Sequence, residues 1–214
     1  MSTALDLKQQ TRRSLGLAGD DTAALPDVDV LEAVNSALAS ITTEREWVWQ
    51  FDTEVGVLTA DDDTLALPAG YVKSSSFTVL FADGERTLIS QLDQADIEGD
   101  DETPAEPLFY SISGGELYLW PTPDDAYGYR HFYYKLETPL VDDADEPLLP
   151  DQFTRWAVVE AALRLHLRTV SPEKYNELRT EAAEWRDRAI RWNFRQILPL
   201  PEITITRESV WQDV

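Results

Sequence analysis

The sequence predicts an α+β fold with N-terminal helices, a central antiparallel β domain, a C-terminal antiparallel helical hairpin and an extended C-terminal tail. Apolar residues recur every three or four positions near both ends of the chain, but alternate with polar residues between about 47 and 137. Gly114 and Gly115 interrupt that alternation, as a tight hairpin turn with positive φ angles requires. Pro199 and Pro201 exclude a helix from the last segment.

Residues 1–46 are expected to form N-terminal helices that pack with the C-terminal helices. The first helix should lie within 3–17 and be closed by Gly16 or Gly19. Asp27 follows a proline that does not fit mid-helix, so it suits the N-cap region of the second helix. The apolar face of that second helix consists of Val30, Leu31, Val34, Ala37, Leu38 and Ile41.

Residues 47–149 are expected to form the antiparallel β domain. The first strand is predicted at 47–51, where alternating aromatic side chains would point into the core. Turns at 83–84 and 114–115 each suit a hairpin, and an aromatic strand is predicted at 129–136. The alternating aromatic residues of the first strand are Trp47, Trp49 and Phe51.

Residues 150–196 are expected to form the helical hairpin, and residues 197–214 an extended arm. The first helix of the hairpin should bury one stripe of side chains, with Val158 and Val159 off that stripe. Pro172 suits the first turn of the second helix. The arm alternates isoleucine and threonine after its two prolines, which is typical of a strand.

The chain of 214 residues is strongly acidic, with 18 Lys and Arg against 40 Asp and Glu, and a formal charge of −22. Residues 1–150 contain 8 basic and 30 acidic residues, whereas 151–197 contain 9 basic and 7 acidic residues, a net of +2. The last 17 residues add a net of −2. An acidic body is therefore joined to a nearly neutral, arginine-rich segment. Because nucleic-acid binding depends on Lys and Arg facing phosphate, this charge argues against a protein that grips nucleic acid with its whole surface.

The acidic residues form short runs, among them 61–63 and 142–146, in segments with turn composition. Solvated loops explain such runs, since like charges avoid burial. A host with high internal salt also explains them, because salt screens the repulsion within an acidic chain. Neither run has the spacing of a calcium-binding loop.

Motifs for enzymatic chemistry are missing from the sequence. The chain has no cysteine, phosphate-binding glycine loop or nucleophile elbow, and its two histidines, His131 and His166, have no partner at relay or metal-ligand spacing. No apolar run is long enough to span a membrane, and no secretory signal is expected at the start. We therefore expect a soluble protein of intracellular type that is not an enzyme and uses no cofactor or metal.

The order of elements, together with several short stretches, resembles the head–tail connector (adaptor) proteins of tailed bacteriophages and archaeal tailed viruses. The similarity covers most of residues 30–195, and its most telling part is Phe132–Leu140, followed by an acidic loop and a helix at 157–165. Its other parts are the helix around 35–41 running into Trp47–Trp49, Leu67–Tyr71 and Pro107–Asp124.

This resemblance implies a structural, non-enzymatic protein of the virion neck that is assembled in the host cytoplasm. It implies a ring of twelve copies beneath the portal protein, which extends the DNA channel and joins the capsid to a downstream tail or neck protein. DNA would pass without specific binding, because acidic loops in the lumen repel it. The arginines of the helical hairpin would pack the ring: Arg164, Arg168, Arg186 and Arg191.

The resemblance also implies that the C-terminal arm grasps the portal. By adding a strand to its partner, the arm would use its apolar side chains as anchors. The anchors are Ile203, Ile205, Val210 and Trp211. A strand tucked onto its own domain is the alternative for this arm. The alternative for the whole chain is a non-enzymatic β-domain module that binds a protein or carbohydrate partner.

Overall fold

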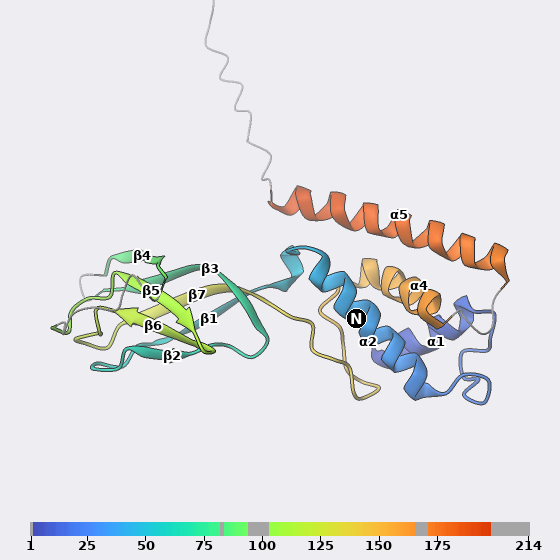
Figure 1. Cartoon of the computed structure of the whole chain (residues 1–214), viewed down its shortest axis with the longest axis horizontal. Coiled ribbons are helices and arrows are strands. Elements are labelled where there is room, and N and C mark those ends of the chain that lie inside the picture. Colours follow the sequence, from blue (N-terminus) through green and yellow to red (C-terminus); the bar gives the residue numbers. More distant parts are fainter. Residues whose placement is uncertain (1, 82–83, 94–102, 166–170, 198–214) are drawn as a thin grey trace, which may run out of the picture.

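The protein is described by a computed structural model, which covers residues 2–81, 84–93, 103–165 and 171–197. The described chain forms a helical unit (2–50 and 140–197) and a β unit (51–139), which lie side by side in Figure 1. The β unit is inserted between two helices, so the chain passes between the units twice.

The helical unit has two adjoining clusters of buried apolar side chains, and α4 contributes to both. Helix α4 contacts α1, α2 and α5, so Val158 and Val159 are both fully buried. The expectation that these two valines lie off the buried stripe is therefore wrong, because three helices cover α4. The helices are α1 (Ala4–Ser14), α2 (Asp27–Glu44), α4 (Thr154–Leu165) and α5 (Pro172–Ile197), with short 3₁₀ turns at η1 (Val48–Gln50) and η2 (Asp151–Phe153).

The ends of the N-terminal helices follow local chemistry. Thr3 caps α1 through a reciprocal pair of bonds with Asp6, and Gly16 beyond the helix has a φ of 82°. Helix α2 has Pro26 at its N-cap position, without a side-chain cap. Asp27 is the first residue of the helix, and its carboxylate binds side chains of α1.

The β unit is a seven-stranded sheet with the order β1-β7-β3-β4-β5-β6-β2. The prediction of a purely antiparallel domain needs one correction: β4 and β5 pair in parallel, because a long connection separates them along the chain. The other pairings between these described strands are antiparallel. The strands are β1 (Phe51–Val57), β2 (Thr64–Ala66), β3 (Tyr71–Leu80), β4 (Arg86–Gln91), β5 (Phe109–Ser113), β6 (Glu116–Trp120) and β7 (Gly128–Lys135).

One face of the sheet curls around an aromatic core. Phe77 of β3 contacts Tyr110 of β5 and stacks on Tyr129 of β7, with ring centroids 5.5 and 5.3 Å apart. The tight turn between β5 and β6 is the predicted one, with φ angles of 61° at Gly114 and 90° at Gly115. These values suit a type I′ hairpin turn.

The predicted strand at 47–51 is wrong in its first part. Trp47 precedes the η1 turn and Trp49 lies within it. Their rings stack on each other at 4.3 Å in the helical core, where Trp47 also meets Trp156 edge-on. The sheet begins only at Phe51, which is 42% exposed. Alternating aromatic residues indicated burial but not the unit in which it occurs.

Three side-chain amides fasten both connections to the helical unit. Asn193 accepts from Val48 N at 2.8 Å and donates to Glu46 O at 3.0 Å. Gln50 donates to the carbonyls of Thr42 and Lys135 at 3.1 and 3.2 Å. Asn35 both donates to and accepts from the backbone of Leu140, at 2.9 Å each.

The bond from Gln50 to Lys135 crosses to the β unit, and the others hold the ends of both connections against the helices, so together they restrain the angle between the two units.

Candidate functional site

The C-terminal hairpin, α4 and α5, contains the residues predicted to pack the ring. Arg155 of α4 binds both carboxylate oxygens of Glu181 on α5, at 2.7 and 3.0 Å, and also donates to Ser14 Oγ at 2.7 Å. The hydrogen bonds from Arg155 lower the pKa of Glu181. This two-pronged contact holds α5 in a defined position against α4 and α1.

The predicted arginine Arg186 is engaged within the chain. Its Nε and Nη2 atoms lie 2.9 and 2.7 Å from Glu44 Oε1 at the end of α2. Arg186 therefore ties α5 to α2. A contact between ring subunits at Arg186 would have to include its ion pair with Glu44.

Arg164 and Arg191 are exposed on two different surfaces. Arg164 lies at the end of α4, beside Arg179, in an open groove of about 430 Å³ between α4 and α5. Arg191 lies in an open groove of about 640 Å³ where α5 passes η2. The other residues that line this second groove are Gln152, Phe153, Trp185, Arg188, Trp192 and Arg195.

The groove at Arg191 combines cations with aromatic rings. The guanidinium of Arg188 lies over the Trp185 ring at 4.7 Å, and Trp192 packs edge-on against Phe153 at 5.5 Å. Phe194, the next aromatic residue on α5, is 54% exposed. Arginine and exposed aromatic residues are enriched in protein interfaces, so this end of α5 has the chemistry of a contact surface.

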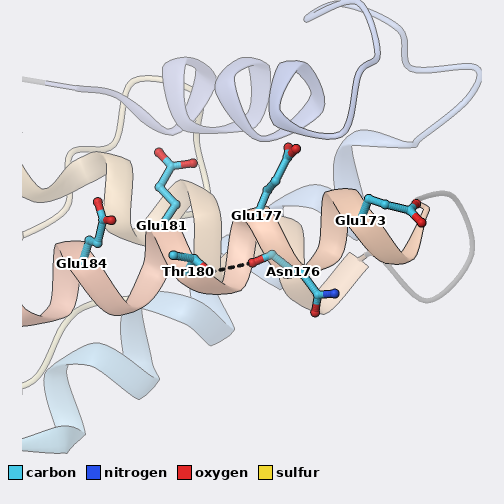
Figure 2. A pocket seen from close by; sticks show the side chains of 6 residues that line it. All are labelled: Glu173, Asn176, Glu177, Thr180, Glu181 and Glu184. Atoms are coloured by element: carbon cyan, nitrogen blue, oxygen red, sulfur yellow. Dashed lines mark hydrogen bonds between the residues drawn. The ribbon is translucent and has the colours of Figure 1, made fainter.

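The N-terminal half of α5 has the opposite charge. Figure 2 shows Glu177, Glu181 and Glu184 projecting to the same side of the helix, where they line a shallow depression of about 470 Å³. Lys174 contacts Glu177 at 3.2 Å, and Thr180 donates to the backbone carbonyl of Asn176 at 2.9 Å. This half of the helix is thus acidic and polar.

A second exposed surface is the outer face of the sheet at β1, which is an edge strand. Val55 and Val57 are both 66% exposed, and Leu88 of β4 is 64% exposed. Phe51 stacks on Phe132 of β7 at 5.8 Å on the same surface. Exposed apolar side chains gathered on one face are typical of an interaction surface.

Comparison with known proteins identifies the family. A family model described as SU10 adaptor protein matches residues 2–193. The chain belongs to this adaptor family. The resemblance to head–tail connector proteins is thereby confirmed. A solved chain from the structure described as "Neck of empty GTA particle computed with C6 symmetry" is 17% identical to the adaptor. That alignment covers 83% of the adaptor and 87% of the other chain, with a TM-score of 0.29. No curated protein matches the adaptor.

The sequence reasoning missed a buried ionic cluster that anchors α1 of the adaptor. Arg12, 1% exposed, donates to Leu25 O at 2.9 and 3.1 Å and binds the Asp27 carboxylate. Lys8, 4% exposed, binds Asp143 at 2.6 Å and Asp27 at 3.1 Å. Two features of the sequence could have indicated this cluster. They are the basic residues on an otherwise amphipathic helix and the position of Asp27 directly after a proline.

This cluster changes the interpretation of one acidic run. Asp143, in the run 142–146, binds Lys8 of α1, and Asp145 accepts from the backbone of Val141 and Asp142 at 2.7 and 2.8 Å. The run is therefore partly structural, not only a solvated loop.

His131 is a core residue of the β unit of the adaptor. It is fully buried, and its Nε2 atom lies 2.7 Å from Ser74 Oγ. Burial lowers the pKa of His131 from 6.5 to about 4, so the ring is neutral at physiological pH. Within the described ranges, no group of three or more His, Asp or Glu side chains is placed to hold a metal ion, and no helix there has the length and hydrophobicity of a bilayer span.

Several predicted residues lie outside the described part of the chain. These are His166, Arg168 and the four proposed anchors of the arm: Ile203, Ile205, Val210 and Trp211.

Proposed function

We propose that this adaptor assembles as a ring of twelve copies beneath the viral portal, extends the DNA channel and joins the capsid to the tail, without enzymatic activity. The observation that carries the proposal is the unequal charge of the two units. The β unit (51–139) contains 4 basic and 18 acidic residues, a net of −14. The helical unit (2–50 and 140–197) contains 13 basic and 19 acidic residues, a net of −6.

This distribution suits a ring in which the helical units touch and the β units stay apart. Repulsion between twelve acidic subunits grows as they approach, so contacts should involve the surface with the least net charge. The hairpin, with a net of +2 for 151–197, is that surface. Acidic side chains that face the lumen would repel DNA and let it slide.

The hairpin arginines are proposed to pack neighbouring copies. Arg164 and Arg191 are exposed in grooves on either side of α5, and Arg186 supports the helix from within the subunit. Arg168 belongs to the same proposed set. We propose that four parts of the chain have separate functions: the helical unit, the β unit, the hairpin within the helical unit and the arm (197–214).

The arm is proposed to bind the portal through its apolar residues, including Val210 and Trp211. Replacing Ile203 and Ile205 by Asp should abolish co-sedimentation with the portal while leaving the native circular dichroism of the chain. The matched control replaces Thr204 and Thr206 by Asp, which adds the same charge to the opposite side of an extended segment. Equal binding by the two double variants would overturn the arm assignment.

The outer face of the sheet is proposed to contact the downstream tail or neck protein. This surface carries exposed apolar side chains and belongs to the unit that lies furthest from α5 in Figure 1. The same surface favours a second candidate function, a non-enzymatic binding module of cellular origin for a protein or carbohydrate. That candidate predicts a stable monomer that does not co-sediment with the portal.

The virion neck is the proposed location, after assembly in the host cytoplasm. Membrane binding is not part of the proposal. The acidity of the β unit suits either a channel lining or a high-salt host, and folding at low salt distinguishes the two. A halophilic chain should lose structure as screening is withdrawn, whereas a channel lining should not require salt.

A further inference from the structure

Along the axis of α5, its exposed face changes from an acidic N-terminal half to a basic C-terminal half. With 3.6 residues per turn, side chains at positions 173, 177, 180, 184, 188, 191 and 195 lie along one stripe. All seven are exposed. The charged residues before position 185 are Glu173, Glu177 and Glu184, and those after it are Arg188, Arg191 and Arg195. Asp187 lies near the boundary between the halves.

Among the described residues, the contacts of this stripe are mostly formed between neighbouring residues of α5 itself, and they leave all seven side chains exposed. Arg188 lies 3.9 Å from Glu184 across the boundary, and Lys174 contacts Glu177 at the edge of the stripe. Arg155 neutralises Glu181, which lies at the side of the helix that faces α4. In Figure 1, α5 forms the outer layer of the helical unit, with α4 on one side and no described element on the other.

We propose that the basic half of α5 in one copy packs against the acidic half of α5 in the next copy, head to tail around the ring. This inference rests on the proposed ring function and identifies the surfaces that close it. Phe194 and the groove at Arg191 supply the apolar part of the contact, and Glu173, Glu177 and Glu184 receive the arginines.

The separation of the two halves along the helix favours a head-to-tail contact. Thr180 and Arg191 are 11 positions apart, which corresponds to about 16 Å along the axis. A contact between different patches on identical subunits can repeat and close a ring. An antiparallel contact about a two-fold axis would also match opposite charges, but it pairs the copies and stops.

The charge of the chain argues against DNA as the occupant of the basic half. The three arginines lie on the same stripe of α5 as three glutamates, in a chain of charge −22. A phosphate backbone that follows α5 would meet the acidic half, whereas a second copy offers both signs in the required order.

Crosslinking in the cysteine-free chain tests the geometry directly. A T180C/F194C double variant is treated with a bifunctional maleimide in two samples: the free protein, and the protein bound to the portal of its own particle. The reaction should give a ladder of covalent trimers and larger species. The single variants T180C and F194C are the controls and should give no species larger than a dimer.

A product that stops at dimers would overturn the head-to-tail contact in favour of a two-fold one. Crosslinks to the portal alone, or no crosslinks in a sample where electron microscopy shows rings, would overturn this inference and leave the ring intact. The lack of rings on the portal would overturn the proposed function as well.

A charge exchange tests the electrostatics. The variant R191E/R195E makes both halves acidic, and E177R/E184R makes both halves basic. Each alone should raise the concentration at half-assembly by about tenfold or more, because like charges then face each other. At an ionic strength of about 0.1 M the Debye length is about 10 Å, so the contact is not screened away.

Mixing the two variants in equal amounts should restore assembly with alternating copies, since each acidic half then meets a basic half. The control R13E/R86E has the same change in charge on exposed residues of α1 and β4 and should assemble like the wild type. Failure of the mixture to assemble better than either variant alone would overturn the proposed contact.

Discussion

The helical unit and the β unit are stabilised in different ways. The helical unit has an enclosed core of aliphatic side chains and tryptophans, which is closed at its edges by ion pairs of Arg12, Lys8 and Arg155. The β unit has a smaller core of aromatic rings around Phe77, and its outer face remains exposed. Its net charge is also more than twice that of the helical unit.

In the proposed ring, the two units would have different roles. A closed unit with ion pairs at its edges can hold the long helix α5 in a fixed position. The repeated contacts of the proposed ring require such a fixed surface. An acidic unit with one open face suits contacts at the periphery and repulsion of DNA. The junction amides hold both connections, and Gln50 also bonds Lys135 of β7, so that the position of one unit is transmitted to the other.

The largest expected effect separates the stability of the two units. Trp156 is 1% exposed and meets Trp47 in the helical core, so Trp156→Ala should lower the free energy of unfolding of the helical unit by about 4 kcal/mol. Trp120→Ala, in half-buried surroundings on β6, is the control and should cost about 1 kcal/mol.

Two spectroscopic signals follow the units separately, since seven of the eight tyrosines lie within 51–139 and five of the seven tryptophans lie in the helical unit. Urea unfolding of Trp156→Ala should shift the tryptophan fluorescence and leave the tyrosine circular dichroism nearly unchanged. Equal shifts of both signals would show that the units unfold as one.

The next effect concerns acid sensitivity of the β unit. Folding lowers the pKa of His131 from 6.5 to about 4, so the unfolded chain binds a proton first as the pH falls. Stability is therefore complete above about pH 6.5 and is lost progressively down to about pH 4, by about 3 kcal/mol in total. The variant His131→Gln should lack this loss. Urea unfolding at about pH 7 and at about pH 4 measures how much the free energy of unfolding changes between the two pH values. A variant with the same pH dependence as the wild type would contradict the assignment.

A smaller effect is expected at the junction. Asn193→Leu leaves the amide of Val48 and the carbonyl of Glu46 without their side-chain partner, which should cost about 2 kcal/mol. It should also broaden the distribution of interunit angles in small-angle X-ray scattering. The control Asn176→Leu is exposed on the same helix and should change neither quantity. Unchanged scattering by Asn193→Leu would show that the amides do not restrain the units.

Periodicity predicted most of the fold because the elements are long and their faces are distinct. The helices, the Gly114–Gly115 hairpin and the aromatic strand at 129–136 follow from local patterns. The parallel pairing of β4 and β5 has no local signal, since it depends on how a distant segment returns to the sheet. The same holds for Trp47 and Trp49, whose alternation is compatible with strand or with a 3₁₀ turn.

The candidate site was predictable in composition but not in geometry. The charge count identified the arginine-rich hairpin, and only the structure shows that Arg186 is engaged with Glu44 while Arg191 borders an aromatic groove. The Lys8–Arg12 cluster depends on residues far apart in the sequence, such as Asp143, which no local pattern connects.

Cryo-electron microscopy of the adaptor bound to the portal of its own particle tests the central claim most directly. We expect a ring in which helical units form the contacts between copies, with α5 of each copy against α5 of the next and the β units separated. A ring held together through β units, or a portal that carries no ordered copies, would contradict the account.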